Sequence, residues 1–97
     1  MNQKTEKKLN DNDFADHQRK IITIREKAVS EICAISRQRD DIVKKRAIAS
    51  MVMANARAEF GNLRTEWSQD IFENESHPFL IDGEIESAVR SMKRALP

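Results

Sequence analysis

Residues 35–42, which read ISRQRDDI, decide the fold, because they form either the middle of one long helix or the turn between two helices. The six central residues are all polar, and Asp40 or Asp41 could cap a second helix. The stretch contains no Gly, Pro or Asn, however. Ile35 and Ile42 lie seven residues apart, in phase with the apolar residues on either side. We therefore favour a continuous helix and keep the turn as the alternative.

Outside this stretch, an apolar residue recurs every seven positions. The spacing predicts one amphipathic helix over about residues 11–60, with a break near residues 37–41 as the alternative. A sustained seven-residue repeat is typical of coiled-coil-like helices, which pack along one seam against a partner. The series consists of Phe14, Ile21, Ala28, Ile35, Ile42, Ala49, Ala56 and Leu63.

The two ends of this helix carry local signals. Residues 1–9 are polar and lysine-rich, and we expect a flexible tail before a single helical domain at residues 10–97. Asn10 suits the N-cap, with Asp13 three residues later, while Leu9 and Phe14 suit a hydrophobic staple. At the other end we expect Gly61 to stop or kink the helix.

After Gly61 the sequence predicts a short helix, then a loop at residues 73–81, then a C-terminal helix from about Gly83. We expect an all-α fold in which both short helices pack on the distal half of the long helix. Its near half then lacks a cover within the chain and must meet a second copy or another protein. The partner-binding candidates there are Phe14, Ile21, Ile24, Ala28 and Ile35.

Composition limits the class of function. The chain has 97 residues, 39% of them apolar and 34% charged, which is apolar-poor and charge-rich for a compact domain. Residues 1–60 hold 13 Lys/Arg and 9 Asp/Glu, whereas residues 61–97 hold 4 and 7. No apolar run approaches the ~18 residues of a membrane span. The single cysteine, Cys33, fits a reducing compartment. We therefore expect a cytoplasmic protein that does not bind membranes.

No motif for catalysis, metal binding or a cofactor is present. The two isolated glycines exclude phosphate-binding loops, and His17 and His77 lie 60 residues apart. We interpret His17 as a solvated surface residue and Cys33 as a small buried one. The sequence therefore predicts a protein that is not an enzyme and holds no metal or cofactor.

Four arginines suggest an alternative function. On a straight helix Arg39, Arg46, Arg57 and Arg64 fall close to one line, which suits contacts with a nucleic-acid backbone. Acidic residues interrupt this basic segment, and the overall pI of about 7.9 is low for a dedicated nucleic-acid binder. A solvated face, or one that pairs with the acidic C-terminal segment, is the competing interpretation.

Three apolar residues follow Pro78 in the acidic segment. Phe79, Leu80 and Ile81 either fold back onto the long helix, which we favour, or remain exposed as a docking site. In the second case Pro78, Phe79 and Leu80 are partner-binding candidates, together with Glu73 and Glu75, which precede them.

The leading functional hypothesis is a non-catalytic protein-binding module: an adaptor, or a small inhibitor that modulates a larger cellular machine. One variant places the acidic segment in the basic channel of a nucleic-acid-processing enzyme. Small charge-segregated helical proteins are also common among phage and mobile-element accessory proteins, by analogy at the level of class. The alternatives are a helical dimer that binds DNA or RNA through the arginines, and a structural coiled coil that only self-assembles.

Overall fold

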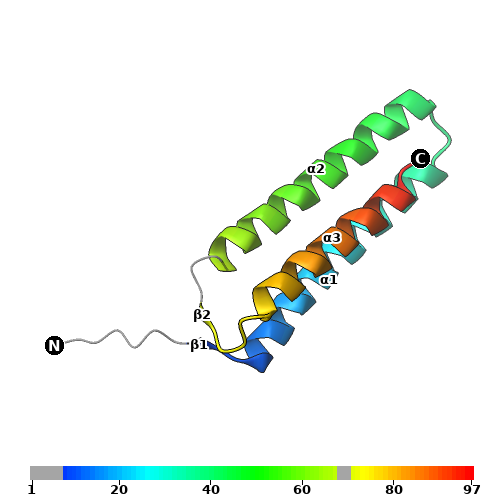
Figure 1. The fold of residues 1–97 in the computed structure, drawn as a ribbon. Helices are drawn as coiled ribbons and strands as arrows, with labels where there is room; N and C mark the ends of the chain where they lie inside the picture. Colours follow the sequence, from blue (N-terminus) through cyan, green and yellow to red (C-terminus); the bar gives the residue numbers. More distant parts are fainter. Residues whose placement is uncertain (1–7, 68–70) are drawn as a thin grey trace.

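A computed structural model describes residues 8–67 and 71–97 as a bundle of three helices. Helix α1 spans Asp11–Arg37, α2 spans Ile42–Trp67 and α3 spans His77–Ala95. Helices α1 and α3 run in the same direction, and α2 runs in the opposite direction (Figure 1). Two strands of two residues, β1 (Lys8–Leu9) and β2 (Ile71–Phe72), pair in parallel at one end. The predicted all-α class is therefore confirmed.

The favoured continuous helix is wrong, because the chain turns back at residues 38–41. Asp41 caps α2: its backbone carbonyl accepts from the amide of Lys45 at 3.0 Å, and its carboxylate accepts from the amide of Lys44 at 3.4 Å. Lys45 also reaches across the turn and donates its Nζ to the carbonyl of Ser36 at 3.0 Å. The cap at Asp41 and the hydrogen bond from Lys45 of α2 to Ser36 near the end of α1 thus hold the turn without the glycine that often follows a helix.

Asp40 belongs to the same turn. Its carboxylate accepts from the amide of Asp41 at 2.8 Å and lies 3.4 Å from the ammonium of Lys44. The backbone N–H of Asp41, and after it the hydrogen bond from Lys44, lower the pKa of Asp40. Asp40 is therefore held charged in the turn at neutral pH.

The end predicted at Gly61 and the start predicted near Gly83 are also wrong. Gly61 lies inside α2, has no positive φ, and α2 continues to Trp67. Helix α3 begins at His77, six residues before Gly83, and its His77–Pro78 peptide is trans. Proline fits the first turn of a helix because the missing N–H has no partner there in any case.

The core lies along α1, which packs against both other helices, whereas α2 and α3 contact each other little. Helix α3 therefore covers α1 rather than the distal half predicted for it. Small residues at the buried positions allow the helices to approach closely. The buried residues comprise Ile21, Ala28, Ile32, Ile35, Ala49, Met53, Ala56, Phe60, Trp67, Phe72, His77, Ile81, Ala88 and Met92.

The start of α1 follows its prediction. The Asn10 side chain accepts from the amides of Asn12 and Asp13 at 2.9 and 3.1 Å, and Asp13 accepts from the amide of Asn10 at 2.9 Å. This reciprocal capping box confirms Asn10 as the N-cap. Of the tail proposed at residues 1–9, Lys8 and Leu9 form β1, and residues 1–7 lie outside the described part of the chain.

Candidate docking surface

Most of the apolar partner candidates on α1 are inside the bundle. Ile21, Ala28 and Ile35 are buried, while Phe14 and Ile24 are partly buried against the same core. The expectation that this half of the helix lacks a cover within the chain is wrong, because the break at residues 38–41 returns α2 along α1 and α3 fills the remaining side. These five residues hold the fold together and do not form a free surface.

The candidates at the start of α3, in contrast, are exposed. Phe79 is 78% exposed and Leu80 is 53% exposed, and Pro78 beside them is also exposed. The fold-back that we favoured for Phe79, Leu80 and Ile81 is wrong for Phe79 and Leu80 and right only for Ile81, which is 2% exposed. Helical geometry explains the division, because residues four apart share a face and His77 and Ile81 occupy the buried one.

Two acidic side chains precede these apolar residues in the chain. Glu73 and Glu75 are exposed in the turn that leads into α3. In that turn the carboxamide of Asn74 accepts from the amide and hydroxyl of Ser76 at 2.9 and 2.6 Å, which holds the backbone before the helix. We call the surface formed by Glu73, Glu75, Pro78, Phe79 and Leu80 the acidic patch.

A buried aromatic cluster supports the backbone beneath the acidic patch. The imidazole of His77 stacks on Phe14, with ring centroids 4.1 Å apart, and meets the edge of Phe72 at 5.7 Å. Its Nε2 lies 3.4 Å from a carboxylate oxygen of Asp11. His77 thus fixes the first turn of α3 to α1 and β2, and the acidic patch is held in place before any partner binds.

His17 joins the same cluster, so its predicted place in solvent is wrong. It lies in α1 and is partly buried, with its ring centroid 4.6 Å from that of Trp67 and 5.8 Å from that of Phe72. Neither histidine could be placed from the sequence alone. Both contact residues of other helices and of β2, and the turn at residues 38–41 has to be known before these elements can be placed side by side. The Pro at the second position of α3 was the available signal for His77.

We call Arg39, Arg46, Arg57 and Arg64 the arginine line. Two of these residues, Arg46 and Arg64, lie on the side of α2 that faces α3. Arg64 pairs with Asp82 of α3 at 3.1 Å, and Arg46 donates to the carbonyl of Pro97 at 3.4 Å. Arg39 and Arg57 are exposed, Arg39 in the turn and Arg57 between the other two on α2. Two of the four nucleic-acid candidates therefore contact the C-terminal part of the chain, which favours the structural interpretation of this line.

Two hollows accompany these surfaces. One, of about 180 Å³, adjoins the acidic patch and is lined by Arg64, Trp67, Phe72, Pro78, Ile81 and Asp82. The other, of about 490 Å³, lies between α1 and α2, where charged residues such as Lys27 and Glu59 surround Ile24 and Val52. The first is small for a ligand pocket and the second is an open groove, so neither has the enclosed apolar form of a small-molecule site.

Within residues 8–67 and 71–97, no three His, Cys, Asp or Glu side chains come together in a way that could hold a metal ion. Within the same residues no helix is long and apolar enough to cross a membrane. Comparison with protein-family models, curated proteins and solved structures gives no match.

Proposed function

We propose that this protein is a non-catalytic binding module, an adaptor or modulator of a larger protein, and that it docks through the acidic patch. The observation that supports this proposal most directly is the exposure of Phe79 and Leu80 next to each other on a rigid helix start. A phenyl ring that is 78% exposed contributes little to the fold but has a large apolar surface to bury in a complex.

The chemistry of the patch specifies its partner. Phe79 and Leu80 require an apolar pocket, and Glu73 and Glu75 require a rim of Lys or Arg around it. We therefore propose a protein partner with a basic groove, which includes the basic channel of a nucleic-acid-processing enzyme. Burial of Phe79 in the complex supplies affinity, and the charged rim supplies the rate of encounter and its dependence on salt.

The test is affinity capture of the tagged protein from a cell lysate, with and without nuclease, followed by titration of the recovered partner. The double variant Phe79→Ala/Leu80→Ala removes the apolar contact without touching the core. We expect it to weaken binding by about 30-fold or more, the loss that corresponds to a hot spot of ~2 kcal/mol. Glu73→Lys/Glu75→Lys should weaken binding at low salt and reduce its dependence on salt.

The matched control is Met51→Ala, which removes an apolar side chain that is 66% exposed near the opposite end of the bundle. This variant should bind the partner like the unmodified protein. Capture that survives in Phe79→Ala/Leu80→Ala, or that disappears equally in Met51→Ala, would show that the acidic patch is not the docking surface. Capture that depends on nucleic acid would move the function to the arginine line.

A further inference from the structure

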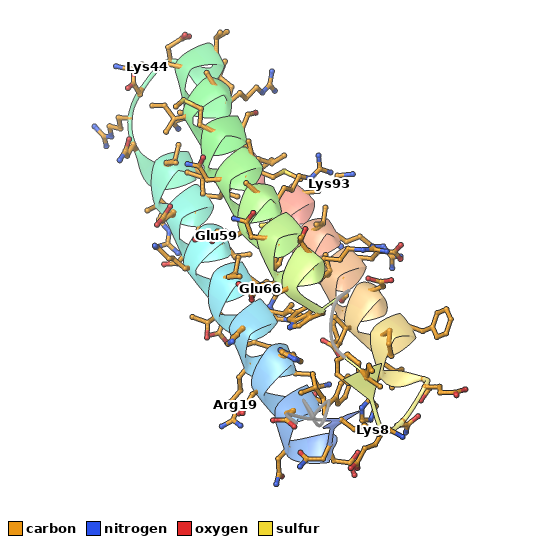
Figure 2. All side chains as sticks on the ribbon, turned by 90° about the vertical axis from the view of Figure 1, so that its left-hand side faces the viewer. Lys8, Arg19, Lys44, Glu59, Glu66 and Lys93 are labelled. Carbon is orange, nitrogen blue, oxygen red and sulfur yellow. The ribbon has the colours of Figure 1, made fainter. Side chains whose placement is uncertain are left out.

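The fold separates charge along the length of the bundle, although the net charge is only +1. The half that contains the turn at residues 38–41, made of residues 25–54 and 87–97, holds ten Lys/Arg and four Asp/Glu, a net +6. The half that contains the strands, made of residues 8–24, 55–67 and 71–86, holds five and ten, a net −5. Figure 2 shows Lys44 at the first end and Lys8 at the other.

The parallel course of α1 and α3 produces this separation. Helix α1 has Asp11 and Asp13 in its first turn and Arg37 in its last turn. Helix α3 has no acidic residue in its first turn, but its acids all precede its cations along the helix, and Lys93 and Arg94 lie in its last turn. Helix α2 starts with three cations beside the turn. Acids near helix N-termini and cations near C-termini are each favourable to the helix dipole, so α1 and α3 contribute to the separation in the same direction.

Exposed large apolar side chains also gather toward the two ends. At the strand end they are Ile71, Phe79 and Leu80, and toward the turn end they are Ile42, Val43, Ile48 and Met51. Val43, Ala47 and Met51 are exposed and four residues apart, so they follow one face of α2.

Cations flank this face. Lys44 lies beside Val43 at the start of α2, and Arg39 lies in the turn; both are exposed. We call the surface formed by Arg39, Val43, Lys44, Ala47 and Met51 the basic patch. It has the composition that the acidic patch requires of a partner, with exposed apolar side chains beside the positive charges of Arg39 and of Lys44, the latter also 3.4 Å from the carboxylate of Asp40.

We propose that the basic patch of one molecule binds the acidic patch of a second copy, so that copies associate head to tail. Phe79 of one copy packs against the exposed face formed by Val43, Ala47 and Met51 of the next, and Glu73 and Glu75 face Arg39 and Lys44. Contacts of like ends are disfavoured by charge, so a symmetric dimer through one end does not form. A contact between two different surfaces leaves a free patch at each end, and further copies add until the chain closes or stops.

The dimensions set the strength of this contact. The bundle is only 23 × 16 Å across, so its ends are narrow. End-to-end contact buries well below the ~1,600 Å² of a standard stable interface. The association is therefore weak, depends on protein concentration, and rests largely on exposed charges that salt screens over ~10 Å at 0.1 M.

This inference rests on the proposed function for one of its two surfaces, the acidic patch, whereas the basic patch takes no part in that function. The two can therefore be tested separately. A variant altered only in the basic patch loses self-association and keeps binding to a different protein partner.

The first experiment is sedimentation velocity of the full chain over a concentration series, at about 20 mM and about 500 mM salt. We expect the weight-average sedimentation coefficient to rise with concentration at low salt, and the association constant to fall by at least about 10-fold at high salt. Protein that stays monomeric at about 1 mM in low salt would overturn the inference.

The decisive experiment uses two complementary variants. Arg39→Glu/Lys44→Glu makes both patches acidic, and Glu73→Lys/Glu75→Lys makes both patches basic. Each variant alone should be monomeric, because its own two patches now repel each other. An equimolar mixture should associate at least as well as the unmodified protein, since each contact again joins opposite charges. A mixture that remains monomeric although both variants are folded would refute head-to-tail pairing.

The matched control is Glu26→Lys/Glu59→Lys, which changes the net charge as much as Glu73→Lys/Glu75→Lys but at exposed positions away from the ends. This control should associate like the unmodified protein at equal salt. Loss of association in the control as well would assign the effect to total charge and not to the two patches. Circular dichroism of every variant confirms that the helices remain.

Discussion

Ile32 and Phe79 are both large apolar side chains, and the fold gives them opposite roles. Ile32 is fully buried in α1 among residues from the other helices, whereas Phe79 projects from the first turn of α3 into solvent. Burial of an aliphatic side chain of this size stabilises a fold by about 1.5–3 kcal/mol, and an exposed ring gains none of that. Ile32 therefore serves stability, and Phe79 is free to serve binding.

The first prediction compares these two residues. Ile32→Ala should lower the free energy of unfolding by about 2–5 kcal/mol, because it removes apolar contacts and leaves a cavity between α1 and the helices that cover it. Urea denaturation followed by circular dichroism at 222 nm measures the change. Phe79→Ala is the control and should alter stability by no more than about 0.5 kcal/mol. Equal losses in the two variants would contradict the assignment of core and surface.

Individual residues also show where sequence reasoning reaches its limit. Asn10 could be assigned as a cap because its partners, Asn12 and Asp13, are its neighbours in the chain. His17 and His77 could not be placed, because they depend on Trp67, Phe72 and Phe14, which are distant in sequence. Local hydrogen bonds are legible in a sequence, and contacts between helices need the topology first.

At the scale of elements, the turn at residues 38–41 explains most of what the sequence concealed. The residue series from Phe14 to Leu63 keeps its seven-residue phase through the turn, and its members are buried or partly buried except Ile42, which is 44% exposed at the start of α2. Periodicity therefore predicted the buried face of both helices apart from Ile42, and it gave no sign of the break. The local signals were the wholly polar run at residues 36–41 and the possible cap at Asp40 or Asp41, and both are compatible with helix as well as with turn.

This ambiguity leads to a second prediction. Replacing residues 38–41 by four alanines removes the cap and supplies the strongest helix formers, so α1 and α2 should fuse into one helix of about 85 Å. The core contacts between them can then form only between two copies, which gives a domain-swapped dimer. Light scattering after size-exclusion chromatography at about 500 mM salt should show a dimer with unchanged helical content.

The control for this variant is Asp41→Ser, which keeps a capping side chain in the same turn. It should remain monomeric at high salt. An alanine variant that is also monomeric, with the stability of the unmodified protein, would show that packing of α1 on α2 enforces the turn without help from its sequence. High salt is needed in both measurements because it suppresses association through the charged ends.

At the scale of the whole molecule, the charge separation has a cost for the monomer. Like charges are brought together at each end, so each end repels itself. We predict that raising salt from about 20 to about 500 mM increases the free energy of unfolding, because screening relieves this repulsion. Urea denaturation at low protein concentration measures it. Glu75→Lys should raise stability at low salt and reduce the salt effect; an unchanged salt response would contradict the prediction.

The parallel pairing of β1 with β2 has a consequence for the order in which the chain folds during synthesis. Lys8 pairs with Ile71 and Leu9 with Phe72, so each residue of β1 leaves the ribosome 63 residues before the residue with which it pairs. At about 5–20 residues per second this delay is roughly 3–13 s. Helices α1 and α2 can pair during that time, with one side of α1 still open, and α3 closes the bundle in the same late step that joins the strands.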